Sequence, residues 1–360
     1  MRLRMRRPFP PPIAADLGSS ALRFLQLDQA GRGISAASEL ELPAEAFDLE
    51  HHLSATDAAL RDLLSARWGS NRRMVVALPA ELVSMTHLHL EAGEDLQTAV
   101  QTRMPDAGID PLIRSIDVSS PWKSSRGGAD LLCLAMPREA VLRYVGVLHD
   151  RKFDIAGVYA PASMLVRAFM HVNRRDTDVD ACTMYIDLSP GRSTVAFAHG
   201  PRLVAARTTE ALAMEDAEAP PRPIASAAPV AATDDDGNLL TAINRRVDQA
   251  PPSMPPVQAA PVHVPEASCD ELRMCMRHHQ SLFSETPITR VVFTGRGALA
   301  AGPCCGIAQA LGLPAQVGDP LARWDASGTD IDCADWHHQL RPQWTVAAGL
   351  ATEFDEEYRR

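Results

Sequence analysis

Residues 13–27 read IAADLGSSALRFLQL, and residues 184–198 read MYIDLSPGRSTVAFA. Each segment has an apolar strand that ends in Asp-Leu, then a tight turn of small residues, then a second strand in which apolar side chains alternate. The two aspartates, Asp16 and Asp187, lie about half the chain apart. A pattern that recurs at this spacing indicates a duplicated unit, so the sequence predicts two similar α/β lobes.

The first turn has the chemistry of a phosphate and metal site. Gly18 lets the backbone approach a ligand, successive N–H groups of the turn can form a nest for an anion, and Ser19 and Ser20 add hydroxyl donors. If the two strand ends face each other across a cleft, Asp16 and Asp187 would hold the waters of Mg²⁺, which prefers oxygen ligands. Taken alone, an Asp-x-Gly-Ser turn is most often only a hairpin turn.

A third turn, Thr294-Gly295-Arg296-Gly297, follows a predicted strand at 289–294. Its glycines would let the backbone pass under a nucleoside. Together the three turns predict a nucleotide site between the lobes. Its candidate residues beyond the first turn are Asp187, Ser189, Gly191, Gly295, Arg296 and Gly297.

Length and composition exclude several classes of protein. The 360 residues suffice for two lobes, and 46% apolar residues suffice for a sizeable core. A net charge of −10 repels phosphodiesters, so we do not expect nucleic acid as a partner. No segment approaches the roughly 18 continuous apolar residues of a membrane-spanning helix, and no apolar segment follows the basic start, as a secretory signal requires. We therefore expect the protein to stay in the cytoplasm unless a partner holds it at the membrane.

Lysine and cysteine usage narrow the chemistry further. The only lysines are Lys123 and Lys152, and neither lies in a P-loop motif. The seven cysteines form no C-x-x-C motif, which argues against a disulfide framework and a zinc ribbon. The sequence therefore excludes a P-loop nucleotidase and does not favour a small disulfide- or zinc-stabilised domain.

Strands and helices alternate in both halves of the chain, which is typical of the α/β class. The predicted strands are 13–16, 21–27, 34–42, 74–78, 83–90, 130–136, 154–159, 182–188, 194–199 and 289–294. The predicted helices are 54–68 (capped by Ser54 and Gly69), 95–103, one that begins at Pro137, 161–171, 268–283, 303–311 and 344–352. Between residues 209 and 266, ten of the 28 prolines and much alanine predict a mostly disordered insertion, with a short helix at 238–247.

Several histidines invite a metal hypothesis. His87 and His89 share one face of a strand, and Cys275, His278 and His279 have a helical spacing that can ligate metal. Exposed histidines and a packed thiol explain the same residues. His51 and His52 are expected in a loop.

At this point the sequence resembles the actin-like superfamily, and within it the PilM proteins of type IV pilus assembly. The resemblance covers nearly the whole chain except 209–266. The segments that carry it are DLGSS (16–20), MVVALP (74–79), VSMTHLHL (83–90), PREAVLRYVGVLHDRKFDIAGVYAPASMLVRAF (137–169), VVFTGRGALAAGPCCGIAQALGLPAQVGDPLAR (291–323) and WTVAAGLAT (344–352).

The resemblance implies two lobes of ribonuclease-H-like topology, a subdomain inserted in lobe I, and a final helix that packs back on lobe I. It also implies ATP, with Mg²⁺, between the lobes. The implied partner is the cytoplasmic N-terminal tail of a bitopic PilN-like inner-membrane protein. The implied divisions are a leader (1–12), lobe I (13–180, with the inserted subdomain at about 80–150), lobe II (181–208 and 267–340), the insertion (209–266) and the final helix (341–355).

The sequence departs from this family in the later turns. In the second turn, Ser189 stands where the family favours glycine, and Pro190 has no N–H to donate. The Pro-rich segment replaces the subdomain that usually holds the adenine, and no lysine follows Lys152. We therefore expect a scaffold in which ATP hydrolysis is lost. The alternatives are a sugar- or acetate-type kinase of the same superfamily and a component like the L protein of type II secretion.

Overall fold

The computed structural model describes residues 11–42, 47–65, 68, 72–119, 128–170, 181–190, 192–209, 266–325, 330–331 and 340–357. Most of the predicted leader and of the Pro-rich insertion, with its short helix at 238–247, lies outside the described residues. The domain boundaries given above stay predictions.

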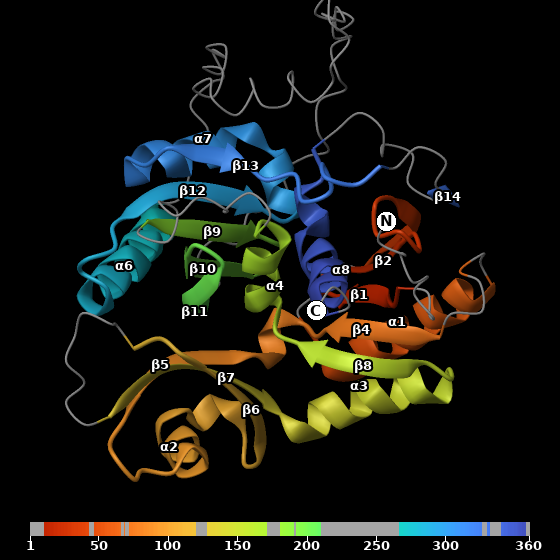
Figure 1. The fold of residues 1–360 in the computed structure, drawn as a ribbon, viewed down its shortest axis with the longest axis horizontal. Helices are drawn as coiled ribbons and strands as arrows, with labels where there is room; N and C mark the ends of the chain where they lie inside the picture. The colour runs from red at the N-terminus through yellow and green to blue at the C-terminus, as the bar shows by residue number, and fades with distance from the viewer. Residues whose placement is uncertain are drawn as a thin grey trace, which may run out of the picture.

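Lobe I is built on a mixed sheet in the order β14-β3-β2-β1-β4-β8. Its outer face is covered by α1 (Leu49–Ser65) and α3 (Arg138–Asp150) (Figure 1). Alternate apolar residues of the strands pack against these helices because successive side chains of a strand point to opposite faces. The strands are β1 (Ile13–Leu17), β2 (Ala21–Leu27), β3 (Ile34–Glu41), β4 (Arg73–Ala77), β8 (Asp154–Tyr159) and β14 (Asp330–Ile331).

Lobe II repeats this plan in the order β11-β10-β9-β12-β13, with α6 (Glu266–Leu282) and α7 (Ala301–Leu311) on its outer face. Three antiparallel strands come first in each lobe, and two parallel strands extend the sheet beyond the first one. The predicted duplication of an α/β lobe is therefore confirmed. The strands are β9 (Cys182–Leu188), β10 (Ser193–His199), β11 (Arg202–Thr209), β12 (Ile288–Thr294) and β13 (Ala315–Val317).

A small antiparallel sheet is inserted in lobe I, in the order β5-β7-β6. It consists of β5 (Ser84–Leu90), β6 (Pro111–Asp117) and β7 (Ala129–Pro137), and α2 (Leu96–Arg103) covers one face. The carboxylate of Asp95 accepts the backbone N–H of Thr98 at 2.9 Å and so caps α2. This sheet also reaches lobe II, because β5 packs against β11.

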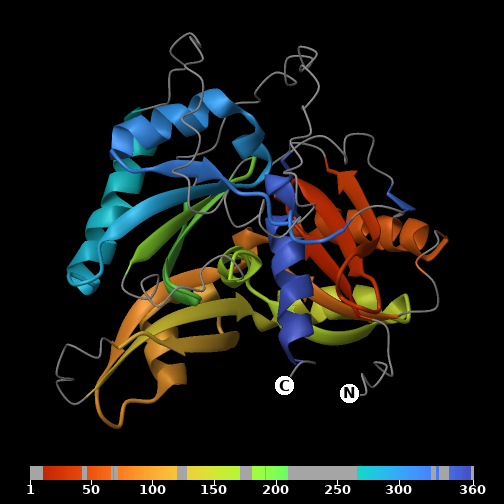
Figure 2. The same ribbon diagram turned by 45° about the horizontal axis from the view of Figure 1, so that its top comes forward.

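Two helices fill the space between the lobes, α4 (Pro161–Ala168) and α8 (Thr345–Glu357) (Figure 2). They pack against each other, while α8 also contacts β1, β2 and β4 and α4 contacts β10. A single apolar core therefore runs from lobe I through both helices into lobe II. No helix in the described part of the chain is long and apolar enough to span a membrane.

One helix prediction is wrong at its start. The helix α1 begins at Leu49 rather than at residue 54, so Ser54 lies inside it, and Gly69 lies outside the described residues. The carboxylate of Asp48 accepts the backbone N–H of His51 at 2.8 Å and caps the first turn. His51 and His52 are therefore helical and not part of a loop. The strands β6, β11, β13 and β14 were not predicted.

Candidate functional site

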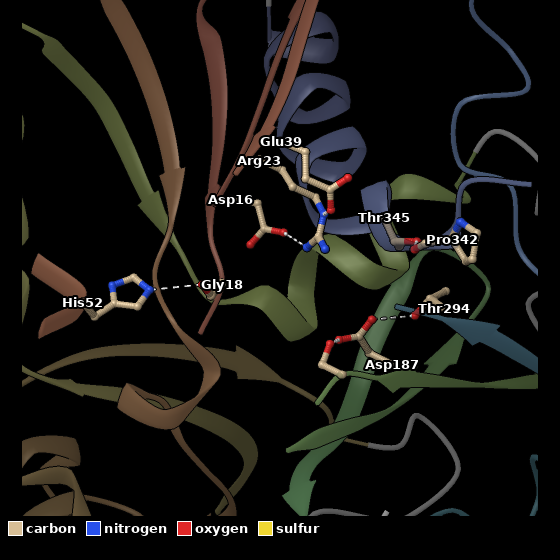
Figure 3. A network of polar contacts seen from close by, with 10 residues as sticks. Asp16, Gly18, Arg23, Glu39, His52, Asp187, Thr294, Pro342 and Thr345 are labelled. Carbon is tan, nitrogen blue, oxygen red and sulfur yellow. Dashed lines mark hydrogen bonds and ion pairs between the residues drawn. The ribbon is translucent and has the colours of Figure 1, made fainter. Parts of the chain in front are cut away.

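The two predicted aspartates lie at equivalent ends of the central strands, Asp16 in β1 and Asp187 in β9. Each side chain is on the sheet face that looks toward the other lobe (Figure 3). The negative charge of Asp187 contributes to the raised pKa of Asp16, so the two carboxylates are close enough to repel each other. The structure thus brings the first and second turns together between the lobes.

A basic residue that the sequence did not single out accompanies these carboxylates. Arg23 on β2 lies directly across from Asp16, and Glu39 on β3 lies directly across from Arg23. Residues in register on neighbouring strands share a face. The three side chains therefore form a row of acid, base and acid in which the guanidinium lies 3.6 Å from Asp16 and 2.8 Å from Glu39.

Burial controls the protonation of the pair. Asp16 is only 5% exposed, and desolvation raises its pKa to about 7, although the charge of Arg23 acts in the opposite direction. Burial also raises the pKa of Asp187, against the hydrogen bonds that it accepts and the charge of Arg23. Because Arg23 acts on both carboxylates, it supplies the positive charge that the sequence had assigned to a metal ion.

The second and third turns hold Asp187 in place. Its carboxylate accepts the hydroxyl of Ser189 at 2.9 Å and that of the buried Thr294 at 3.1 Å. A Cβ atom at Gly295 would lie 2.6 Å from the carbonyl oxygen of Leu188, and Gly295 has a φ of +79°. The predicted Gly-x-Gly turn therefore packs on β9, and at Gly295 this side of the backbone is not open to a ligand.

The first turn is supported from α1 by a histidine that the sequence interpretation had assigned to a loop. Nε2 of His52 donates to the carbonyl oxygen of Gly18 at 3.1 Å, and Nδ1 accepts the hydroxyl of Tyr144 at 2.7 Å. Burial lowers the pKa of His52, which favours the neutral ring that this pair of bonds requires. Gly18, Ser19 and Ser20 themselves are half-buried.

The remaining predicted site residues include Arg296 and Gly191. Arg296, in the third predicted turn, forms an ion pair with Glu41 at the end of β3. This pair links lobe II to lobe I. Both side chains are well exposed. Gly191 lies outside the described residues.

The residues between the lobes fit the implied ligands unequally. The half-buried turn at Gly18, Ser19 and Ser20 suits a phosphate group, because it combines backbone donors with hydroxyls. A hydrated Mg²⁺ does not fit beside Asp16 and Asp187, because Asp16 is buried, Asp187 is half-buried, and the charge of Arg23 acts on both carboxylates. Magnesium would have to displace an internal ion pair.

Comparison with known proteins identifies the fold. No family model matches the sequence, and no curated protein matches it. A chain of a PilM–PilN type IV pilus biogenesis complex superposes with a TM-score of 0.65 and 14% identity, over 96% of this chain and 99% of that one. The chain therefore has the two-lobed actin-like α/β fold. Within that fold, as the sequence suggested, it is similar to PilM.

More distant matches include ethanolamine utilization protein EutJ from Carboxydothermus hydrogenoformans, with 10% identity and a TM-score of 0.44 over 97% of this chain and 91% of that one. The cytoplasmic domain of EpsL, an inner-membrane component of the type II secretion system of Vibrio cholerae, matches with 12% identity and a TM-score of 0.35. That match covers 55% of this chain and 71% of the other.

Proposed function

We propose that this protein is an actin-like scaffold of type IV pilus assembly that binds the cytoplasmic N-terminal tail of a PilN-like membrane protein. The observation that carries the proposal is the likeness in fold, over nearly the full length of both chains, to a chain of a PilM–PilN complex. In this role the protein lies in the cytoplasm and is held at the inner membrane by its partner.

ATP enters this proposal as a structural ligand with its phosphates against Gly18, Ser19 and Ser20. Hydrolysis is not part of the proposal. Phosphoryl transfer relies on a metal ion and a residue that positions the attacking water. Arg23 lies 3.6 Å from Asp16, and the hydroxyls of Ser189 and Thr294 both donate to Asp187. These contacts favour a fixed arrangement of charge over a catalytic one.

The proposal is tested with the full chain and fluorescent peptides that match the N-terminal tails of candidate bitopic pilus proteins. We expect saturable binding of one such tail in fluorescence anisotropy and none of a scrambled peptide. If no candidate tail binds at concentrations up to millimolar, the scaffold proposal is wrong.

Ser19→Glu provides a matched control, because it places a negative charge in the half-buried first turn and should exclude a phosphate by repulsion. The variant should still bind the peptide. ATP should raise the melting temperature of the native chain and leave that of Ser19→Glu unchanged. No shift in the native chain would remove ATP from the proposal and leave the peptide result to decide the scaffold role.

A further inference from the structure

Three potential metal ligands meet in lobe II, on the side of its sheet that α6 covers. They are Cys182, His199 and His279, whose ligating atoms all lie within 4.8 Å of one another. The scaffold role makes no use of them. The helical set named from the sequence is not the one that forms, since His278 is exposed and only His279 joins the cluster.

The sheet register explains why these residues meet. Cys182 is the first residue of β9 and His199 the last of β10, and the two are directly paired. Paired residues of neighbouring strands share a face, and α6 covers this face. The helix α6 thereby places Nε2 of His279 at 3.0 Å from Nε2 of His199.

The side chain of His279 is buried among aromatic rings, with its Nε2 directed at His199. The ring is fully buried, stacked on Phe197 at a centroid distance of 4.9 Å and tilted against Phe283 at 5.2 Å. Among the residues that the structure describes, no group forms a hydrogen bond with its Nδ1. The contact between the two Nε2 atoms is the polar contact that a metal ion at this position would replace.

Both rings are in the protonation state that ligates metal. Burial lowers the pKa of His199 to about 4 and that of His279 to about 3, so each ring is neutral at pH 7. Burial raises the pKa of the Cys182 thiol to about 12. A metal ion would therefore have to displace the thiol proton to solvent, as metal ligation by cysteine does generally.

We propose that Cys182 Sγ, His199 Nε2 and His279 Nε2 bind one Zn²⁺ ion. Zinc takes imidazole nitrogen at about 2.0–2.1 Å and thiolate sulfur at about 2.3 Å in a tetrahedron, so its ligand atoms lie roughly 3.3–3.7 Å apart. The present separations, 3.0 Å between the two Nε2 atoms and at most 4.8 Å within the cluster, lie on either side of this range. Two nitrogens and one sulfur select Zn²⁺ over Mg²⁺ or Ca²⁺.

The site would have three protein ligands and one open position. His199 is half-buried, whereas Cys182 and His279 are buried, so the open position lies on the His199 side and can take a water molecule. The ion would fasten β9, β10 and α6 together at one end of the lobe II sheet. The ring of His87 from β5 lies edge-on to Phe283, which places the inserted sheet next to the aromatic residues around this site.

The test uses the full chain, freed of metal with a chelator and titrated with Co²⁺. Cobalt reports a bound thiolate through a ligand-to-metal charge-transfer band and reports tetrahedral geometry through intense visible absorption. We expect both signals to saturate at one equivalent and to be abolished by Zn²⁺. We expect Zn²⁺ to raise the melting temperature of the metal-free chain.

Cys182→Ala should lose the charge-transfer band, because it removes the thiolate. His199→Gln, at the half-buried ligand, should lose the stoichiometric binding. His278→Gln and Cys275→Ala, on the same helix but outside the cluster, should keep both. Absence of the band in the native chain, or its persistence in folded Cys182→Ala, would overturn the proposal. If Cys182→Ala does not fold, His199→Gln decides the test. Stoichiometric binding by this variant equal to that of the native chain would overturn the proposal.

Discussion

Arg23 supplies the positive charge beside the carboxylates of Asp16 and Asp187. The motif around Asp16 and Asp187 was recognisable because both segments end in Asp-Leu before a turn. The importance of Arg23 was not, since it depends on the strand register that sets Asp16, Arg23 and Glu39 side by side. His52 was missed for a similar reason, because its contact with Gly18 joins two elements that are distant in sequence. For Arg23, the available signal in the sequence was a single arginine in the otherwise largely apolar strand 21–27.

The raised pKa of Asp16 predicts how stability changes with pH. Its folded-state value of about 7 lies above the unfolded value of 3.8. The native state therefore holds the proton more tightly, and its stability falls as pH rises from about 4 to about 7 and then levels off.

Asp16→Asn removes this titration. Between pH 5 and pH 8, the variant should gain about 2–3 kcal/mol relative to the native chain in urea unfolding. Parallel pH profiles of the two proteins would show that Asp16 does not titrate in this range.

At the scale of elements, regular patterns were predicted well and irregular ones were not. The strands at 21–27, 154–159 and 182–188 agree with β2, β8 and β9 because apolar runs or alternation mark their whole length. The strand β6 was missed because its sequence PLIRSID mixes charged and apolar residues on a half-buried sheet. The start of α1 was placed too late because Asp48, rather than Ser54, caps it.

The contact between α4 and α8 gives a prediction about packing. A Cβ atom at Gly349 in α8 would lie 2.2 Å from the carbonyl oxygen of Met164 in α4. Gly349→Ala must therefore push the two central helices apart, and we expect a loss of about 1–3 kcal/mol in the free energy of unfolding. Gly146→Ala in α3, where a Cβ would meet no atom within 4 Å, is the matched control. It should stabilise by about 0.5–1 kcal/mol. Equal effects of both changes in urea titrations would contradict the close contact.

At the scale of the whole molecule, an exposed ion pair between Arg296 and Glu41 joins the two lobes. Such a pair contributes less than about 1 kcal/mol to global stability. It bridges the third turn in lobe II and β3 in lobe I, so its loss removes a contact between the lobes beside the first turn. We therefore expect Arg296→Glu to leave the unfolding midpoint nearly unchanged and to speed amide exchange at the first turn, residues 16–20.

A reciprocal variant tests whether the effect belongs to the pair. Arg296→Glu combined with Glu41→Arg should restore slow exchange at the first turn. Arg138→Glu breaks a similarly exposed pair with Asp110 that lies within lobe I, and it should leave the exchange as in the native chain. If Arg138→Glu speeds exchange as much as Arg296→Glu does, the ion pair does not hold the lobes together.

The position of α8 has a consequence for biosynthesis. This helix packs on β1, although nearly all of the described chain separates the two in sequence. Contacts so distant along the chain form late and slowly. While lobe II is still being synthesised, the inner face of β1 and β2 lacks its covering helix. These strands therefore expose apolar surface until α8 has been synthesised. Nascent chains stalled before residue 345 should therefore depend on chaperones that shield apolar surface.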